Sequence, residues 1–188
     1  MARLSPAALK ARAAKVRLVA LDVDGVLTDG RLYFGSDGEA LKAFDVRDGF
    51  GIRLLRQGGI DVAIVTGRSS PIVEARAREL GIERVLQGQR DKRAALEHLM
   101  REVGAGTQHC AFMGDDWPDL AALGAVGLSA TVADAPHEVR KRVDWIAPSP
   151  GGRGAVRDLA SMLLRAQGRF DALLRTAVAG MPKEIGNG

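Results

Sequence analysis

Two aspartates, Asp22 and Asp24, stand one residue apart directly after an apolar run that ends at Leu21. Side chains alternate along an extended chain, so the two carboxylates point the same way while Val23 points toward the core. Carboxylates this close repel each other unless a cation lies between them or one of them holds a proton. The pair therefore predicts a Mg²⁺-assisted site with one nucleophilic carboxylate and one acid/base, the alternative being a polar turn that only caps a strand.

Three further polar side chains stand where phosphoryl chemistry would need them. Thr66 ends an apolar run and precedes a glycine, so its hydroxyl and the nearby backbone N–H groups can bind a phosphoryl oxygen. Lys92 opens a predicted helix and can offset clustered carboxylates. Asp115, on a Gly-Asp turn, is placed as a third carboxylate around one cation, and Mg²⁺ prefers few carboxylates together with water and phosphate oxygens. Taken singly, Thr66 and Asp115 could be helix N-caps and Lys92 a solvated residue, but together they indicate phosphoryl chemistry.

The elements that must position these residues alternate between strand-like and helical patterns. This alternation predicts a Rossmann-like, doubly wound α/β fold with a parallel sheet, in which sites lie at the carboxyl ends of strands. The predicted strands are 16–23, 60–66, 83–86, 109–114, 125–129 and 143–146. The predicted helices lie near 49–57, 70–80, 91–103, 116–123, 135–142 and 153–167, after a short helix that opens near Ser5.

One segment, 31–44, interrupts this alternation with two extended runs around an Asp-Gly turn, which predicts an inserted β-hairpin. Its unpaired edges and its apolar residues Leu32 and Phe34 predict contacts between copies of the chain. The length suits a single domain over 1–188. The last residues, 181–188, contain several helix breakers and are predicted to form a mobile tail.

Composition argues against several classes of protein. The net charge of +4 is spread among acidic residues rather than gathered in a basic stripe with aromatics, so we expect no nucleic-acid partner. The absence of a long uncharged apolar window predicts no membrane span, and the start of the chain lacks the apolar core of a secretory signal, so we expect a cytoplasmic location. The single Cys110 excludes an internal disulfide.

Taken in order, these signals resemble the four motifs of the haloacid dehalogenase-like phosphohydrolase superfamily. The motifs are matched by Asp22 and Asp24, by Thr66, by Lys92, and by Asp115 with Asp116 and Asp119. The resemblance implies that Asp22 attacks phosphorus to form an aspartyl-phosphate, while Asp24 protonates the leaving alcohol and later deprotonates water. It implies that Thr66 and Lys92 hold the transferred phosphoryl oxygens.

The resemblance also implies a set of metal ligands and an oligomer. Mg²⁺ would be held by the carboxylate of Asp22, the backbone carbonyl of Asp24 and the carboxylate of Asp115, with Asp116 and Asp119 supporting them. Neither interval between the motifs leaves room for the cap domain that many relatives carry over the site. Relatives of this kind are tetramers whose hairpins form a central barrel, so the resemblance implies a homotetramer built through 31–44.

Further segments resemble the capless members of the superfamily that hydrolyse acidic sugar phosphates. These segments are 22–30, 45–49, 66–68, 87–88 with Lys92, and 151–157. The implied substrate is 3-deoxy-D-manno-octulosonate 8-phosphate, a precursor in lipopolysaccharide synthesis. The alternatives are a nine-carbon sialic or deaminated-sialic acid 9-phosphate, or a non-catalytic oligomerisation module, which would be expected to lose Asp22 or Asp24.

An acidic sugar phosphate needs binding groups beyond those that hold the phosphoryl group. The candidates from the matching segments are Asp45, Val46, Arg47, Asp48, Gly49, Arg53, Arg68 and Arg76, together with Lys92. We expect Arg68 and Arg76 to bind the substrate carboxylate, because arginine presents a planar fork that matches it. We expect the glycine-rich loop 151–154 to approach the site of a neighbouring subunit.

Overall fold

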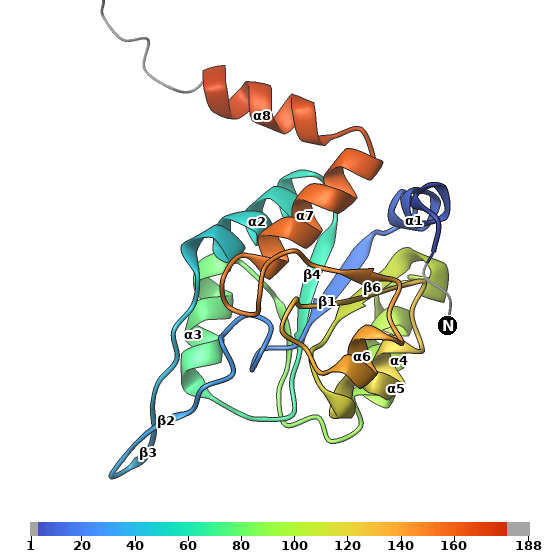
Figure 1. Cartoon of the computed structure of the whole chain (residues 1–188). Coiled ribbons are helices and arrows are strands. Elements are labelled where there is room, and N and C mark those ends of the chain that lie inside the picture. Colours follow the sequence, from blue (N-terminus) through green and yellow to red (C-terminus); the bar gives the residue numbers. More distant parts are fainter. Residues whose placement is uncertain (1–3, 180–188) are drawn as a thin grey trace, which may run out of the picture.

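The computed structural model describes residues 4–179. Its centre is a six-stranded sheet in the order β5-β4-β1-β6-β7-β8 (Figure 1). The strands are β1 (Leu18–Leu21), β4 (Asp61–Val65), β5 (Arg84–Leu86), β6 (Cys110–Met113), β7 (Leu128–Thr131) and β8 (Trp145–Ile146). Each predicted strand is present and each neighbouring pair is parallel, so the predicted doubly wound α/β fold is confirmed.

The middle of the sheet explains where the site lies. All residues of β1, β6 and β7 are buried, as expected for parallel strands that helices cover on both faces. The chain leaves β1 toward β4 and β5 on one side and later fills β6, β7 and β8 on the other. The strand order therefore reverses at β1, and ligands in such sheets bind beyond the carboxyl ends of the strands at that point.

The helices form two layers around the sheet. They are α1 (Pro6–Ala13), α2 (Val46–Gln57), α3 (Pro71–Leu80), α4 (Lys92–Glu102), α5 (Leu120–Leu123), α6 (His137–Arg140), α7 (Ala155–Ala166) and α8 (Phe170–Ala179). In Figure 1, α2, α3 and α7 cover one face of the sheet, and α4 and α5 cover the other. α8 extends away from the body beyond the last helical range that we predicted.

Two helix starts show how local sequence sets the boundaries. α1 begins at Pro6, and the Ser5 hydroxyl accepts a hydrogen bond from the N–H of Ala8 at 3.2 Å. α2 begins at Val46, three residues before the predicted start, because the Asp45 carboxylate caps it by accepting the N–H of Arg47 at 2.7 Å. The predicted helix over 116–123 consists of a 3₁₀ turn, Trp117–Asp119, followed by the short α5.

The predicted hairpin is present as a separate two-stranded sheet, with shorter strands than the sequence suggested. β2 (Tyr33–Gly35) and β3 (Gly38–Leu41) pair antiparallel and project from the body in Figure 1. Gly38 has a φ of +113°, which favours glycine at this turn. Phe34 remains 64% exposed, so the apolar face of the hairpin is open. No cap is inserted within residues 25–91, where hairpin, α2 and β4 precede Thr66 and α3 and β5 follow it.

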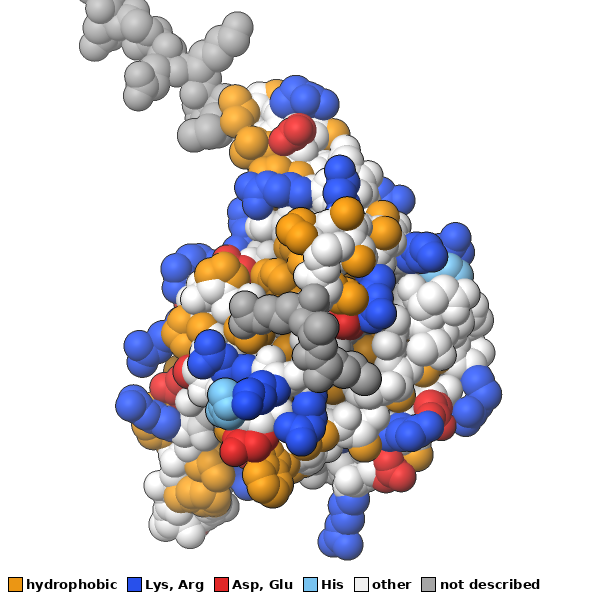
Figure 2. Space-filling view, turned by 45° about the vertical axis from the view of Figure 1, so that its right-hand side comes forward, with side chains coloured by type: hydrophobic (Ala, Val, Ile, Leu, Met, Phe, Trp, Pro, Cys, Tyr) orange, Lys and Arg blue, Asp and Glu red, His pale blue; other side chains and the backbone are white. Residues whose placement is uncertain are grey.

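Surface chemistry adds two observations. Figure 2 shows Lys and Arg side chains dispersed over the face that it presents, with acidic and apolar groups between them. Among residues 4–179, no helix combines the length and apolar character needed to cross a membrane. The segment 181–188, which the sequence predicts as a mobile tail, lies outside the described residues.

Candidate active site

The turn that follows β1 carries the first pair of aspartates. The N–H of Asp22 donates to the carbonyl of Met113 at 3.0 Å, which extends the β1–β6 pairing and fixes Asp22 at the sheet edge. Its side chain is buried, whereas Asp24 is partly exposed. Gly25 has a φ of +94°, and a Cβ there would lie 2.1 Å from Oδ2 of Asp115. Glycine at this position therefore lets the turns after β1 and β6 come together.

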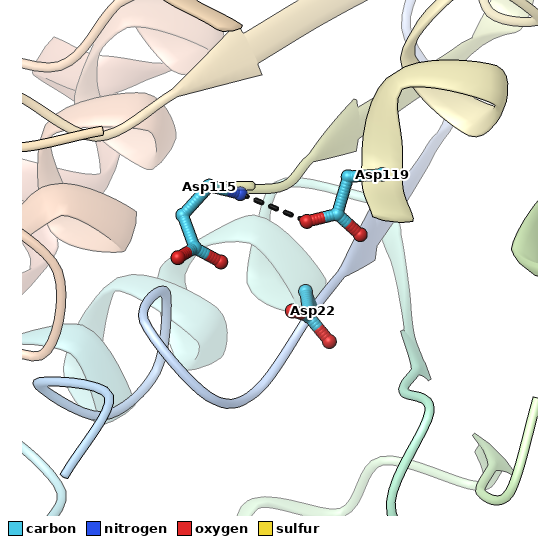
Figure 3. A group of neighbouring side chains, drawn as sticks. All are labelled: Asp22, Asp115 and Asp119. Atoms are coloured by element: carbon cyan, nitrogen blue, oxygen red, sulfur yellow. Dashed lines mark hydrogen bonds between the residues drawn. The ribbon is translucent and has the colours of Figure 1, made fainter. Parts of the chain in front are cut away.

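Three carboxylates converge at this edge of the sheet. Asp22, Asp115 and Asp119 each offer an oxygen, and these atoms lie within 4.8 Å of one another (Figure 3). The oxygens of Asp119 are already engaged, because Oδ1 accepts from the ammonium of Lys92 at 2.6 Å and Oδ2 accepts from the N–H groups of Asp115 and Asp116 at 3.0 and 3.2 Å. Asp119 therefore fixes the turn, and Asp22 and Asp115 are the carboxylates placed to meet a cation.

Burial and mutual repulsion disturb the ionisation of this cluster. Burial raises the pKa of Asp22 to about 6, with repulsion from Asp119 adding to it and Lys92 opposing it. Burial raises the pKa of Asp115 to about 8, and repulsion from Asp22 and Asp119 adds to the rise. Burial alone would lower the pKa of Lys92, but attraction to Asp22 and Asp119 outweighs it and the pKa is raised. The carboxylates of the cluster thus carry more negative charge than the Lys92 ammonium offsets.

The donor set fits a hard divalent cation. Oδ1 of Asp22 is buried and accepts no hydrogen bond within the described residues, although the Lys92 ammonium forms an ion pair with it at 2.9 Å. Carboxylate oxygens are the ligands that Mg²⁺ and similar cations favour, and a cation here would offset the repulsion that raises both pKa values. Asp22 and Asp115 therefore fit a metal site that needs additional oxygen ligands.

Thr66 and Lys92 reach the same edge from neighbouring elements. Thr66 directly follows β4, whose register pairs Leu21 with Ile64, so Thr66 lies beside the turn that carries Asp22. Its backbone is held by the hydrogen bond from its N–H to the carbonyl of Leu86 at 3.0 Å. Lys92 is the first residue of α4 and is buried against the carboxylates of the cluster. Lys92 thus contacts the carboxylate cluster, and Thr66 lies at the same edge of the sheet.

The hairpin adds two charged residues that we did not identify in the sequence. The ammonium of Lys42 forms ion pairs with the Asp24 carboxylate and, at 3.0 Å, with Oε1 of Glu39. Arg68 lies beside the same groups, with Nε 3.6 Å from Oδ2 of Asp24 and Nη2 3.5 Å from Oε1 of Glu39. A Lys–Glu pair in a hairpin is an ordinary surface pattern, so only the fold shows that Lys42 meets Asp24.

Several predicted substrate-binding residues make contacts that hold local structure, and their role in substrate binding stays a prediction. Asp45 caps α2 and pairs with Arg47, whose guanidinium also donates to the carbonyl of Arg153 at 2.8 Å. Asp48 is buried and accepts two backbone N–H groups at the start of α7, at 3.0 and 2.9 Å. Burial raises the pKa of Asp48, and the two backbone N–H groups oppose that rise. The structure does not bring Asp48 to the carboxylate cluster.

The remaining candidates lie along α2 and α3. Val46 and Arg53 are exposed. Arg76 pairs with Glu79 at 2.7 Å and its guanidinium lies 5.7 Å from the ring centre of Phe44. A Cβ on Gly49 would lie 2.5 Å from Nη2 of Arg76, so the glycine makes room for this arginine. Among the arginines named as substrate ligands, Arg68 is the one that the structure places beside Asp24.

The glycine-rich loop 151–154 packs against the turn after β1. The N–H of Gly152 donates to the carbonyl of Val26 at 2.9 Å, and a Cβ on Gly151 would lie 1.8 Å from the carbonyl oxygen of Gly25. Glycine is therefore required sterically where the two loops touch. The loop supports the first-motif turn of its own chain, and its approach to a neighbouring subunit stays a prediction.

Comparison with known proteins identifies the family. A family model of haloacid dehalogenase-like hydrolases matches residues 46–127. The 3-deoxy-D-manno-octulosonate 8-phosphate phosphatase KdsC of Escherichia coli K12 is 47% identical over 86% of each chain. The corresponding protein of Haemophilus influenzae is 45% identical, over 82% of this chain and 86% of its own.

Solved structures agree with this relationship. The Moraxella catarrhalis 3-deoxy-D-manno-octulosonate 8-phosphate phosphatase, in complex with a magnesium ion, a phosphate ion and a KDO molecule, matches with a TM-score of 0.89 and 43% identity, over 92% of this chain and 99% of its own. A cobalt-bound phosphatase of this type from Haemophilus influenzae matches with a TM-score of 0.84 and 43% identity, over 86% and 94%. This chain belongs to the family of 3-deoxy-D-manno-octulosonate 8-phosphate phosphatases among the haloacid dehalogenase-like hydrolases.

Proposed function

We propose that this chain is a Mg²⁺-dependent phosphatase that hydrolyses 3-deoxy-D-manno-octulosonate 8-phosphate to the free sugar acid and phosphate. The observation that carries the proposal is the buried Asp22 and the half-buried Asp115 beside Lys92, at the point where the strand order reverses. Relatives named as 3-deoxy-D-manno-octulosonate 8-phosphate phosphatases align over most of both chains. The structure of one of them holds magnesium, phosphate and KDO. The product would feed lipopolysaccharide precursor synthesis.

In the first step, a carboxylate oxygen of Asp22 forms a bond to phosphorus while the bond from phosphorus to the sugar oxygen breaks. The electron pair of that bond stays on the sugar oxygen, which takes a proton from the Asp24 carboxyl and leaves as an alcohol. Thr66 and Lys92 hold the transferred phosphoryl oxygens as charge spreads over them. The buried position of Asp22 at the sheet edge fixes the direction of attack.

In the second step, the Asp24 carboxylate takes a proton from water as the water oxygen bonds to phosphorus. The bond between phosphorus and Asp22 breaks, phosphate leaves, and Asp24 regains the proton that it gave in the first step. A bound Mg²⁺, held by the Asp22 carboxylate, the Asp24 carbonyl and Asp115, would neutralise the carboxylates and the phosphoryl oxygens.

The residues around this centre would determine which sugar phosphate the enzyme binds. Arg68 carries an exposed guanidinium beside Asp24 and is the strongest candidate to bind the sugar carboxylate. A nine-carbon sialic or deaminated-sialic acid 9-phosphate presents the same two anionic groups and is the alternative substrate. The non-catalytic alternative is disfavoured because all residues matched to the four motifs are present.

The assembly and location belong to the same proposal. An open site without a cap excludes water poorly, and a homotetramer formed through the 31–44 hairpin would cover it. The exposed Phe34 and Leu41 on the hairpin support such contacts. A cytoplasmic location is part of the same proposal.

A phosphate-release assay tests the function directly. Purified protein is offered the eight-carbon acid phosphate, a nine-carbon sialic acid 9-phosphate and a neutral hexose phosphate, each with Mg²⁺ and with excess EDTA. We expect the highest kcat/KM on the eight-carbon acid and loss of turnover with EDTA. A higher kcat/KM on the nine-carbon acid phosphate would identify that compound as the preferred substrate in place of the eight-carbon one. Full turnover in EDTA would contradict the metal-dependent mechanism.

A further inference from the structure

At the end of the hairpin, a buried lysine lies against the turn that carries the catalytic aspartates. Lys42 directly follows β3, yet its side chain is only 1% exposed. Its ammonium pairs with Oδ1 of Asp24 and, at 3.0 Å, with Oε1 of Glu39. Removing an ammonium from water is unfavourable unless it is paired, so these two carboxylates hold Lys42 in one place.

A further set of contacts fixes Glu39. Its Oε2 accepts a hydrogen bond from the hydroxyl of Ser70, and its Oε1 lies 3.5 Å from Nη2 of Arg68. Ser70 is buried at the start of α3, and its N–H donates to Oε1 of Gln87 at 2.7 Å. Lys42 is therefore tied to the α/β body as well as to the hairpin.

The two carboxylate oxygens of Asp24 make different contacts with these neighbours. Oδ1 is bound by Lys42, whereas Oδ2 faces Nε of Arg68 at 3.6 Å, which is longer than a hydrogen bond. The contact with Lys42 thus sets the rotation of the carboxyl group and leaves Oδ2 as the oxygen able to carry a proton. A reacting group displaced by about 1 Å can lose about 10²-fold in rate.

We propose that Lys42 is a positioning residue that orients Asp24 for proton transfer to the leaving group. This inference rests on the proposed phosphatase function. In the first step, the proton moves from Oδ2 of Asp24 to the sugar oxygen as the bond from that oxygen to phosphorus breaks and Asp22 bonds to phosphorus. Without the Lys42 ammonium, the carboxyl group loses the partner that fixes its rotation.

The leaving group decides how much this orientation matters. A sugar or simple alkyl oxygen is a poor leaving group and needs the proton, whereas p-nitrophenolate leaves as an anion without it. The ratio kcat/KM covers binding and the formation of the aspartyl-phosphate, so it reports on the first proton transfer and not on the later hydrolysis. A defect in Asp24 orientation should therefore depend on the leaving group.

The test compares Lys42→Met with the wild type on three substrates: the eight-carbon acid phosphate, glycerol 3-phosphate as a simple alkyl phosphate, and p-nitrophenyl phosphate. We expect kcat/KM to fall roughly 10- to 100-fold on both alkyl phosphates and less than about threefold on the aryl phosphate. Lys42→Arg, which keeps a cation, should recover part of the loss. Lys141→Met, at an exposed lysine, is the matched control and should match the wild type on all three.

Each other pattern overturns the inference. No loss, or an equal loss on all three substrates, would show that Lys42 does not act through proton transfer. A loss confined to the eight-carbon acid would make Lys42 a binding residue for the sugar acid. If Lys42→Met does not fold, Glu39→Gln is the second variant, because it removes one of the two charges that hold Lys42. It should give the same dependence on the leaving group with smaller losses. If it does not, the inference is wrong. Wild-type protein inactive on every substrate would instead overturn the proposed function.

Discussion

Two regions of the site differ in how the chain positions them. We call the residues at the carboxyl edge of the sheet the catalytic floor, and those that surround it from the hairpin and the adjoining turns the rim. The floor comprises Asp22, Thr66, Lys92, Asp115 and Asp119. The rim comprises Glu39, Lys42 and Arg68. Four of the five floor side chains are buried, whereas on the rim Lys42 is buried but Arg68 is 43% exposed.

The difference reflects what each region has to do. Asp22, Thr66 and Asp115 follow β1, β4 and β6, whose register is fixed by strand pairing, so the distances between them are set by the sheet itself. Rim residues stand on a hairpin and on turns, where side chains and loop conformations can change without disturbing the core. We therefore expect bond making and breaking at phosphorus to depend on the floor, and substrate choice and the orientation of Asp24 to depend on the rim.

The largest expected effect is at the nucleophile. Asp22→Asn should lower turnover at least about 10³-fold, because an amide cannot attack phosphorus although its shape is nearly the same. Circular dichroism and the Tm should remain those of a folded protein. Asp37→Asn, at an exposed position on the hairpin, is the matched control. Retention of more than a few per cent of wild-type turnover would refute the assignment of Asp22.

The next effect concerns Asp115, whose pKa is raised from 3.8 to about 8 in the folded protein, chiefly by burial. Between about pH 4 and pH 8, the folded metal-free protein therefore binds more protons than the unfolded chain, and its free energy of unfolding falls as pH rises through this window. Asp115→Asn carries no charge to bury. In EDTA, we expect it to raise the Tm at pH 8.5 by more than about 4 °C and to change it little at pH 4.

The same variant should lose activity, because a metal ligand is removed. With Mg²⁺ present, turnover should fall roughly 100-fold or more, and the Mg²⁺ concentration for half-maximal activity should rise. Gain of stability with loss of activity would be the expected behaviour of a floor residue. A Tm that falls at pH 8.5 in EDTA would contradict the repulsion that we assign to this carboxylate cluster.

A smaller and more selective effect is expected at the arginines. Arg68→Ala should lower kcat/KM on sugar-acid phosphates by about ten- to a hundredfold through loss of a charge-assisted contact, and should spare p-nitrophenyl phosphate. Arg76 packs beside Phe44 and pairs with Glu79, so Arg76→Ala should lower the Tm and change kcat/KM on sugar-acid phosphates less than Arg68→Ala does. Equal losses on both substrates in Arg68→Ala would show that Arg68 serves the phosphoryl group or the fold rather than the sugar acid.

The smallest effect on chemistry is expected at the hairpin tip. Phe34→Ser should convert the proposed tetramer to smaller species in light scattering, because the side chain is apolar and 64% exposed. Turnover of p-nitrophenyl phosphate should change only severalfold at most, since the floor does not involve Phe34. Leu174→Ser, which removes an exposed apolar side chain from α8, is the control and should leave the assembly intact. A wild-type protein that is monomeric at working concentration would refute the hairpin interface.

The strands along the chain and the sheet edge that carries the floor could be predicted, because local signals in the sequence mark both. Buried apolar runs mark β1 and β6, and the polar residue that follows each run marks the end of a strand. Parallel strands bring those ends to one edge, so Asp22 and Asp115 could be expected to meet.

Contacts between segments far apart in the chain could not be predicted in this way. The cap that Asp48 supplies to α7 joins residues that are distant in sequence, and no local pattern separates it from a ligand-binding carboxylate. The pairing of Lys42 with Asp24 depends on how the hairpin folds back over the turn after β1. Residue types and their spacing thus determined the reaction chemistry of this protein, while the tertiary structure decided which charged side chains support the fold and which surround the site. The physical reason is that strand and helix patterns arise from neighbouring residues, whereas ion pairs and caps depend on distances that only the packed chain sets.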